Sequence, residues 1–231
     1  MILGLTRSWS LTGYFIAVIL ILPLIALIVQ STLPDEAVFS HLFNTVLPTY
    51  IANSLLLMLL VGLGSLLLAI PAAWVIARCD FPFRRSFQWL LLLPLAMPAY
   101  IVAYVYTDML DYAGPVQRTL RDWFEWQSPH DYYFPAIRSL GGAAIILSLV
   151  LFPYIYLLAR TAFMEQSSSL LYASRVMGCS PWRSFWRLAL PMARPALAVG
   201  VALVAMETAA DFATVSYFAV PTLTTAVYDT W

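Results

Sequence analysis

Long apolar runs separated by short polar stretches dominate this chain. A helix needs about 20 mostly apolar residues to cross a bilayer. The segments that meet this condition are residues 11–32, 54–77, 88–107, 140–159 and 196–217. Prolines lie inside these segments, as membrane helices tolerate: Pro23, Pro71, Pro94, Pro98 and Pro153. The pattern predicts an all-α fold, a polytopic helical bundle that forms a single transmembrane domain over residues 1–231.

The polar segment between the last two apolar runs predicts two short helices joined by a tight turn. Gly178 can adopt the left-handed conformation that ends a helix. Ser180 is a good N-cap, and Pro181 suits the first position of the next helix. Aromatic residues then recur at helical spacing, with two arginines on another sector of the surface: Trp182, Phe185, Trp186, Arg183 and Arg187. Pro191 and Pro195 are expected to end this second helix.

Composition excludes several classes of protein. The chain is 62% hydrophobic and only 10% charged, with a mean hydropathy of +0.82, which is too apolar for a soluble domain of 231 residues. Its formal net charge is zero, so nothing global indicates a nucleic-acid partner. Cys79 and Cys179 lack a metal-ligand spacing. Catalytic constellations and phosphate-cradling glycine loops are missing as well, so we expect no enzyme activity, cofactor or metal site in this chain.

The basic residues predict the orientation of the chain. All twelve are arginines. With a cytoplasmic N-terminus, nine of them fall on the cytoplasmic side, together with the loop 160–195, in agreement with the positive-inside rule. These nine are Arg7, Arg78, Arg84, Arg85, Arg160, Arg175, Arg183, Arg187 and Arg194. The remaining three, Arg118, Arg121 and Arg138, are then external.

Residues 170–191 resemble the coupling loop of ABC importer permeases. The pattern of that family is Glu-Ala-Ala, three residues, Gly, nine residues, Ile, one residue and Leu-Pro. The matching positions here are Ala173, Ser174, Gly178, Leu188, Leu190 and Pro191. Tyr172 stands at the glutamate position, which is a departure from the pattern. The resemblance implies that the loop contacts an ATPase through Ala173, Gly178, Ser180, Pro181, Trp182, Arg183, Leu188, Leu190 and Pro191.

Three further stretches are most similar to ferric-iron importer permeases of bacterial inner membranes: residues 94–117, 180–200 and 206–231. The resemblance covers nearly the whole chain. It implies a type I importer permease fold and a multi-pass inner-membrane protein that works by alternating access. The implied partners are cytoplasmic ABC ATPase subunits, a periplasmic substrate-binding protein, a second permease half and membrane lipid. A sixth span is expected beyond Trp231, so the chain is interpreted as the first half of a permease.

Two carboxylates in the last predicted span are candidates for a substrate pathway. Glu207 and Asp211 are spaced i, i+4 and would share one helix face. Ionisable groups at membrane depth are costly and tend to face a bundle interior or a water-filled path. Carboxylates also suit a hard, highly charged cation in transit. The alternative is a structural role, with Asp211 at the outer interface and Glu207 bonded to a neighbouring helix.

Other readings of the sequence stay open at this point. Within the same superfamily, the substrate could be thiamine, a polyamine, sulfate or phosphonate. A different class is a membrane-anchored helix-turn-helix regulator, because two helices, a turn and several arginines also describe nucleic-acid recognition. The segment is tethered at both ends by predicted spans, which leaves little room for a helix to enter a DNA groove. A membrane enzyme is a third reading, opposed by the missing catalytic constellation.

Overall fold

The computed structural model describes residues 2–31, 46–126, 128 and 131–229, and helices are the only regular secondary structure among them. The all-α prediction is therefore confirmed. The chain divides into two units, residues 1–48 and 49–231, and each is described by itself. The first unit contains α1 (Ile2–Ser31), with an apolar stretch over Gly13–Ala26. Thr32, the last residue of the first predicted span, lies outside the described residues.

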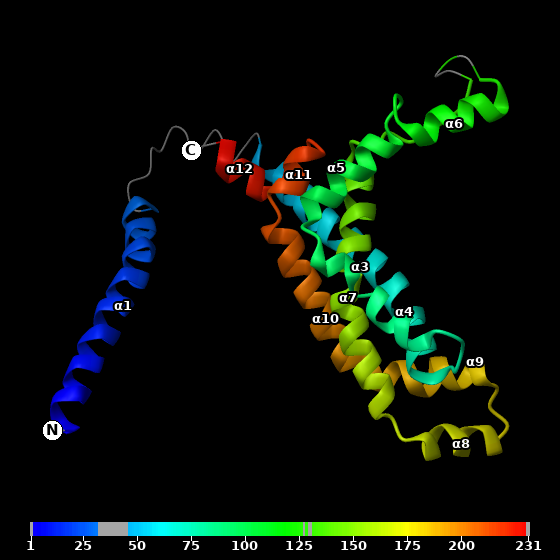
Figure 1. Cartoon of the computed structure of the whole chain (residues 1–231), viewed down its shortest axis with the longest axis horizontal. Helices are drawn as coiled ribbons and strands as arrows, with labels where there is room; N and C mark the ends of the chain where they lie inside the picture. Colours follow the sequence, from blue (N-terminus) through cyan, green and yellow to red (C-terminus); the bar gives the residue numbers. More distant parts are fainter. Residues whose placement is uncertain (1, 32–45, 127, 129–130, 230–231) are drawn as a thin grey trace. The chain divides into compact units, whose positions relative to one another are not determined.

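Three long apolar helices organise the second unit (Figure 1). They are α3 (Leu47–Arg78), α7 (Leu140–Glu165) and the continuous helix Pro181–Ala210, and each is long and apolar enough to cross a membrane. The predicted spans 54–77 and 140–159 lie within α3 and α7. Pro71 and Pro153 stay inside their helices, as the sequence predicted.

The core of this unit is centred on α7, which is buried along most of its length and packs against α3, α5 and α10. Small residues allow these helices to approach closely, as is typical inside membranes. A Cβ atom on Gly64 of α3 would lie only 2.4 Å from Ser148 Oγ of α7. A Cβ atom on Gly200 of α10 would lie 3.0 Å from the Cα atom of Ile155 in α7. The interfaces are therefore tight enough to require glycine.

The third predicted span, 88–107, is not one straight helix. The chain bends by 94° between Arg84–Ala96 and Ala99–Phe124. A bent pair of this kind counts as at most one crossing of the membrane, so this crossing stays a prediction. The pieces are α4 (Arg84–Leu90), the short 3-10 helix η1 (Leu93–Ala96), α5 (Ala99–Leu110) and α6 (Pro115–Phe124).

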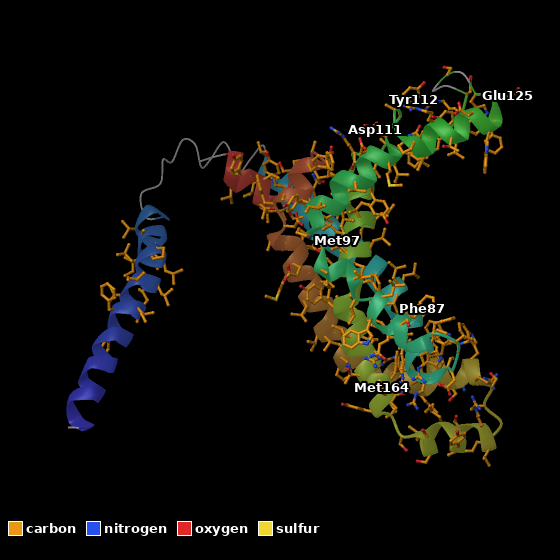
Figure 2. The ribbon with its side chains drawn as sticks, in the orientation of Figure 1. Phe87, Met97, Asp111, Tyr112, Glu125 and Met164 are labelled. Carbon is orange, nitrogen blue, oxygen red and sulfur yellow. The ribbon has the colours of Figure 1, made fainter. Side chains whose placement is uncertain are left out.

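Two prolines explain the break in this segment. Pro94 lies in η1 and Pro98 immediately precedes α5. A proline forces the residue before it towards extended backbone, and Met97 has φ −108° and ψ 129°. Figure 2 shows Met97 at this break and Asp111 and Tyr112 at the joint between α5 and α6. Both prolines therefore lie at a break between helices and not inside one continuous helix.

The ends of the second unit carry different elements (Figure 1). One end carries α8 (Ser168–Val176), α9 (Pro181–Ser184) and the π-helical turn η2 (Phe185–Ala189). The opposite end carries α11 (Ala213–Tyr217) and α12 (Leu223–Asp229).

Two predicted boundaries are corrected at these ends. Because α7 continues to Glu165, the polar loop predicted over 160–195 begins at Gln166. The last predicted span, 196–217, is also not one helix. Its helix, α10 (Leu190–Ala210), ends at Ala210, and residues 213–217 form the separate helix α11.

The contact between α3 and α7 yields a first prediction. Gly64→Ala should lower the melting temperature of the purified protein, because its Cβ would overlap Ser148 and overpacking of this kind costs about 1–3 kcal/mol. Gly62→Ala is the matched control, since its Cβ would lie 3.8 Å from Val201 Cγ1. Adding Ser148→Gly to Gly64→Ala should recover part of the loss. Equal melting temperatures for the two single variants would contradict the packing described.

Candidate functional site

The turn between α8 and α9 has the geometry that the sequence predicted. Gly178 adopts a left-handed backbone conformation, with φ +83°. Its N–H donates to the Arg175 carbonyl, and the N–H of Cys179 donates to the Ser174 carbonyl, both at 3.0 Å. This pair of hydrogen bonds is a Schellman motif, which satisfies the last carbonyls of a helix. Ser180 Oγ then accepts from the N–H of Arg183, so it caps α9 as predicted.

Buried side chains hold the two short helices together and against the bundle. Ser174 Oγ of α8 lies 2.8 Å from Ser184 Oγ of α9, and both residues are buried. Phe185 is the one member of the predicted aromatic face that is buried. Its ring centroid lies 4.9 Å from that of Trp74 in α3, and Trp74 in turn packs edge-on against Phe163 of α7. The segment is therefore fixed to two of the long helices.

The helix that starts at Pro181 does not end at Pro191 or Pro195, which corrects the prediction. It continues through the π-turn η2 into α10. A proline removes one backbone donor and its ring clashes with the carbonyl four residues earlier, here that of Arg187. In the wider π-turn, the N–H of Leu190 donates to the Phe185 carbonyl, five residues back. The π-turn thus allows the helix to continue through Pro191. Turns of this type commonly occur at functional sites.

Gln166 connects the three long helices at this end of the unit, and the sequence analysis missed it. Its Nε2 donates to the Ala189 carbonyl in η2 at 2.8 Å. The backbone carbonyl of Gln166, at the end of α7, accepts from the guanidinium of Arg78 in α3 at 2.7 Å. Gln166 is 8% exposed, and no local sequence signal could have found it, because its amide bonds to a carbonyl 23 residues away.

The residues predicted to contact an ATPase fall into two groups. Six are exposed: Ala173, Gly178, Ser180, Pro181, Trp182 and Arg183. Leu188, Leu190 and Pro191 are half-buried on the η2–α10 side. The exposed surface also includes Tyr172 and two large apolar side chains of the turn, Val176 and Met177, at 89% and 77% exposure.

The carboxylates Glu207 and Asp211 do not share a helix face, because α10 ends between them. Asp211 follows the last residue of α10 in extended backbone, with ψ 112°. Its carboxylate accepts from the backbone N–H and the hydroxyl of Thr214, at 2.7 and 2.8 Å, and so caps α11. Glu207 remains in α10 and is exposed. The local bond of Asp211 differs from the bond to a neighbouring helix that the alternative reading required.

Tyrosines lie beside this break. Tyr100 and Tyr104 of α5 line a cavity of about 310 Å³ together with Tyr217 of α11. The ring centroids of Tyr104 and Tyr217 are 6.1 Å apart. In the described part of the chain, no three histidine, cysteine or acidic residues form a group able to hold a metal ion.

This arrangement of long apolar helices around a short, rigid polar turn defines a multi-pass membrane permease. A family model described as "Binding-protein-dependent transport system inner membrane component" matches residues 65–229. The chain belongs to this family, which consists of transporter permeases and not of enzymes. The predictions of an ABC importer permease and of a multi-pass inner-membrane protein are thus confirmed.

Curated relatives carry several cargo names. A probable sulfate transport permease from Chlorokybus atmophyticus is 29% identical over 86% of this chain and 68% of its own length. The molybdenum transport permease ModB of Escherichia coli (strain K12) is 29% identical over 67% and 65%. An Fe(3+)-transport permease, FbpB 2 of Haemophilus influenzae, is 26% identical over 81% of this chain and 32% of its own length. The matched part of the chain thus spans about two thirds of the first two relatives and one third of the third.

A solved structure has the same fold. It is a bacterial alginate ABC transporter in complex with an alginate pentasaccharide-bound periplasmic protein. One of its chains superposes with a TM-score of 0.69 over 97% of this chain and 84% of that chain, at 20% identity. This chain therefore shares the fold of that transporter's membrane chain.

Proposed function

We propose that this chain is the membrane-spanning part of an ATP-driven importer and that α8 and its turn are where cytoplasmic ATPase subunits act. The observation that carries this proposal is the Schellman turn at Gly178, held rigidly between two long helices and exposed on its outer side. Partners that grip a short helix use exposed apolar anchors of this type. Tyr172, Val176 and Met177 provide them.

A mechanical path leads from α8 to the long helices. Ser174 and Ser184 join α8 to α9, and α9 is continuous with α10. Gln166 and Arg78 link the same end to α7 and α3. ATP-driven closure of the ATPase pair would therefore move the long helices together, and alternating access would follow from this rocking.

The remaining partners follow from the family and from its relatives. A binding-protein-dependent transport system requires a substrate-binding protein, and the solved alginate transporter is described with a periplasmic one. We assign a periplasmic binding protein, the ATPase subunits, a second permease half and membrane lipid to this chain, and no nucleic acid. The N-terminus is proposed to be cytoplasmic because the arginines favour that orientation.

Ferric iron is the proposed cargo. One relative is an Fe(3+)-transport permease. Glu207 and Asp211 offer carboxylate oxygens, which are hard ligands suited to a hard cation in transit. An exposed carboxylate such as Glu207 is costly beside lipid, so a water-filled pathway is a more favourable environment.

A tetrahedral oxyanion is the second candidate cargo. Relatives named for sulfate and molybdenum transport have identities of 29%. An oxyanion would be repelled by Glu207 and Asp211 and would gain from hydroxyl and backbone N–H donors instead. The two cargoes therefore make opposite demands on the same carboxylates.

Replacing Gly178 tests the coupling role. Gly178→Val should separate ATP hydrolysis from uptake in reconstituted vesicles of the complete transporter, because a β-branched residue is strained at φ +83°. Apart from the two residues that flank Gly178, no atom of the described residues lies within 4 Å of the position of an added Cβ, so the effect would be conformational and not a clash. Gly178→Asn is the matched control and should stay coupled, since asparagine tolerates this conformation. Normal coupling in Gly178→Val would remove the turn from the mechanism.

Labelling with an impermeant thiol reagent tests the orientation. In a Cys79→Ser background, Cys179 should react only from the cytoplasmic side. A second probe, Tyr133→Cys in a variant that also carries Cys79→Ser and Cys179→Ser, should react only from outside, because Tyr133 is 91% exposed near the opposite end of the unit. The reverse pattern would overturn both the topology and the coupling role.

Charge removal tests the pathway and the cargo together. Asp211→Asn keeps an oxygen that can accept from the Thr214 N–H, so it removes the charge while retaining the cap. Asp211→Asn and Glu207→Gln should each lower the uptake of ferric iron several-fold, and the yield of assembled complex should be unchanged. Thr214→Val keeps the charge and loses the hydroxyl, and so it reports the structural contribution.

The assay compares radioactive ferric iron with molybdate and sulfate on the same vesicles. Uptake of iron alone, reduced by both charge-removing variants, is the expected result. Uptake of an oxyanion alone would replace the proposed cargo. Normal iron uptake in both variants would exclude the two carboxylates from the pathway.

A further inference from the structure

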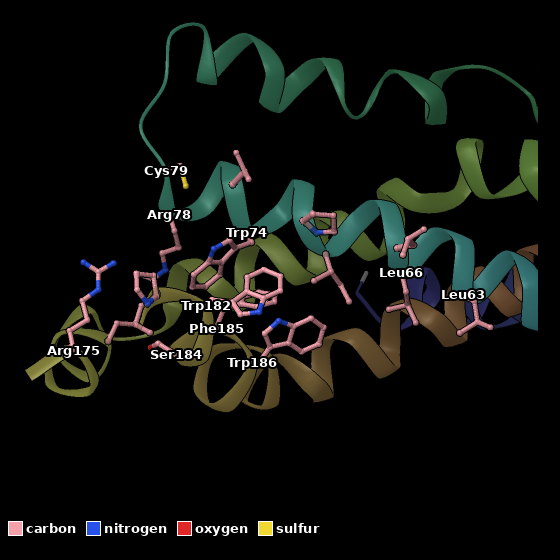
Figure 3. A pocket seen from close by; sticks show the side chains of 16 residues that line it. Leu63, Leu66, Trp74, Arg78, Cys79, Arg175, Trp182, Ser184, Phe185 and Trp186 are labelled. Carbon is pink, nitrogen blue, oxygen red and sulfur yellow. The ribbon is translucent and has the colours of Figure 1, made fainter. Parts of the chain in front are cut away.

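A large apolar groove follows the outer side of α3 towards the coupling end of the molecule. Its volume is about 750 Å³, within the range of about 300–1,000 Å³ that is usual for ligand pockets. It is lined by α3 from Leu63 to Arg78, by Cys79 and by side chains of α8, α9 and η2. We call it the α3 groove; Figure 3 shows its lining side chains.

The two ends of the α3 groove differ in chemistry. Leu63 and Leu66 lie at one end, whereas Arg78 and Arg175 lie at the other (Figure 3). Among the residues that the structure describes, none that lines the groove is acidic. The Nε atom of Arg78 is buried and has no hydrogen-bond partner in the described part of the chain. Arg175 is exposed, and its guanidinium likewise forms no hydrogen bond with the described residues. This end therefore presents two positive charges to an anion, and the exposed guanidinium of Arg175 is the accessible donor.

The length of the groove matches half of a bilayer. Leu63 is near the midpoint of α3, and Arg78 is its last residue. Fifteen residues at 1.5 Å each give about 22 Å. One leaflet, including its headgroups, is about 20–22 Å thick. The groove is thus about as long as one leaflet is thick.

Tryptophan rings lie between the two ends. Trp74, Trp182 and Trp186 all line the groove, and the last two are largely exposed. Tryptophan is enriched where acyl chains meet headgroups, because its ring is apolar and its N–H is a donor. The order along α3 is thus leucine, tryptophan and arginine, which is the order of acyl chain, glycerol region and phosphate in a phospholipid.

We propose that the α3 groove binds one anionic phospholipid of the leaflet on the α8 side, with its phosphate between Arg78 and Arg175 and its acyl chains along Leu63 to Pro71. A lipid held there touches α3, α8 and η2 at once. It therefore fills the space between α3 and α8, the helix proposed to contact the ATPase. The site is independent of the cargo and of the orientation of the chain.

Lipid titration tests the proposal. The complete transporter is purified in mild detergent and titrated with phosphatidylglycerol or phosphatidylcholine, and bound lipid is counted by native mass spectrometry. Phosphatidylglycerol should bind more tightly. Arg175→Ala and Arg78→Gln should each weaken its binding by about tenfold, the usual effect of losing one charge-assisted hydrogen bond. Arg187→Ala is the matched control, because Arg187 is exposed in η2 but does not line the groove.

A second variant separates shape from charge. Val75→Trp fills the middle of the groove and should lower the occupancy of both lipids. Equal binding of the two lipids, or binding unaffected by the arginine and Val75 variants, would overturn the proposal.

A photo-reactive residue at position 75 identifies the occupant directly in native membranes. Attachment to lipid supports the proposal. Attachment to a second permease chain, to an ATPase subunit or to another segment of this polypeptide would overturn it.

Discussion

A backbone N–H or carbonyl left without a partner in hydrocarbon costs several kcal/mol, and this constraint determines where the helices of this protein can break. Where the long helices end or change type, a side chain or a π-turn provides hydrogen-bond partners for backbone groups. Asp211 caps α11 after α10 ends. Gln166 donates to the Ala189 carbonyl, and Arg78 donates to the carbonyl of Gln166, directly after α7. These polar groups occur where the chain leaves regular α-helix.

The same hydrogen bonds connect the elements that the proposed mechanism moves together. Gln166 bonds to a carbonyl of η2 through its side chain and to α3 through its backbone. At the opposite end, the N–H of Leu223 donates to Ser54 Oγ of α3, and Asn53 Nδ2 donates to the Pro221 carbonyl. Both ends of α3 are therefore tied to segments from the last third of the chain. The hydrogen bonds that satisfy these backbone groups therefore also join the long helices to one another.

The sequence predicted local features with strong chemical signatures. Gly178, Ser180 and Pro181 are residues favoured at a helix C-terminus, at an N-cap and at the first helical position, and the structure has them at these positions. The family pattern was readable because its spacing depends on this turn. Long apolar runs predicted the helices α3 and α7, since twenty apolar residues have few alternatives in a membrane.

Features that depend on tertiary context were beyond the sequence. Hydropathy does not distinguish a proline that is absorbed, such as Pro153, from one that breaks a span, such as Pro98, because neighbouring contacts decide the outcome. The spacing of Glu207 and Asp211 predicted a shared face, which was lost when Asp211 became a cap. The amide of Gln166 has no local signature, since its partner is 23 residues away.

The π-turn at η2 also sets the rotational phase of α10. In an α-helix each residue advances by about 100°, so Phe185 would turn away from Thr208 if the whole helix were regular. The wider turn absorbs much of this drift and keeps Phe185 and Ala189 buried on the same side as Leu197 and Val204. A π-turn contains one residue more than a regular α-helical turn, and its position can shift along a helix. Such a shift would rotate one part of the helix against the other without breaking it.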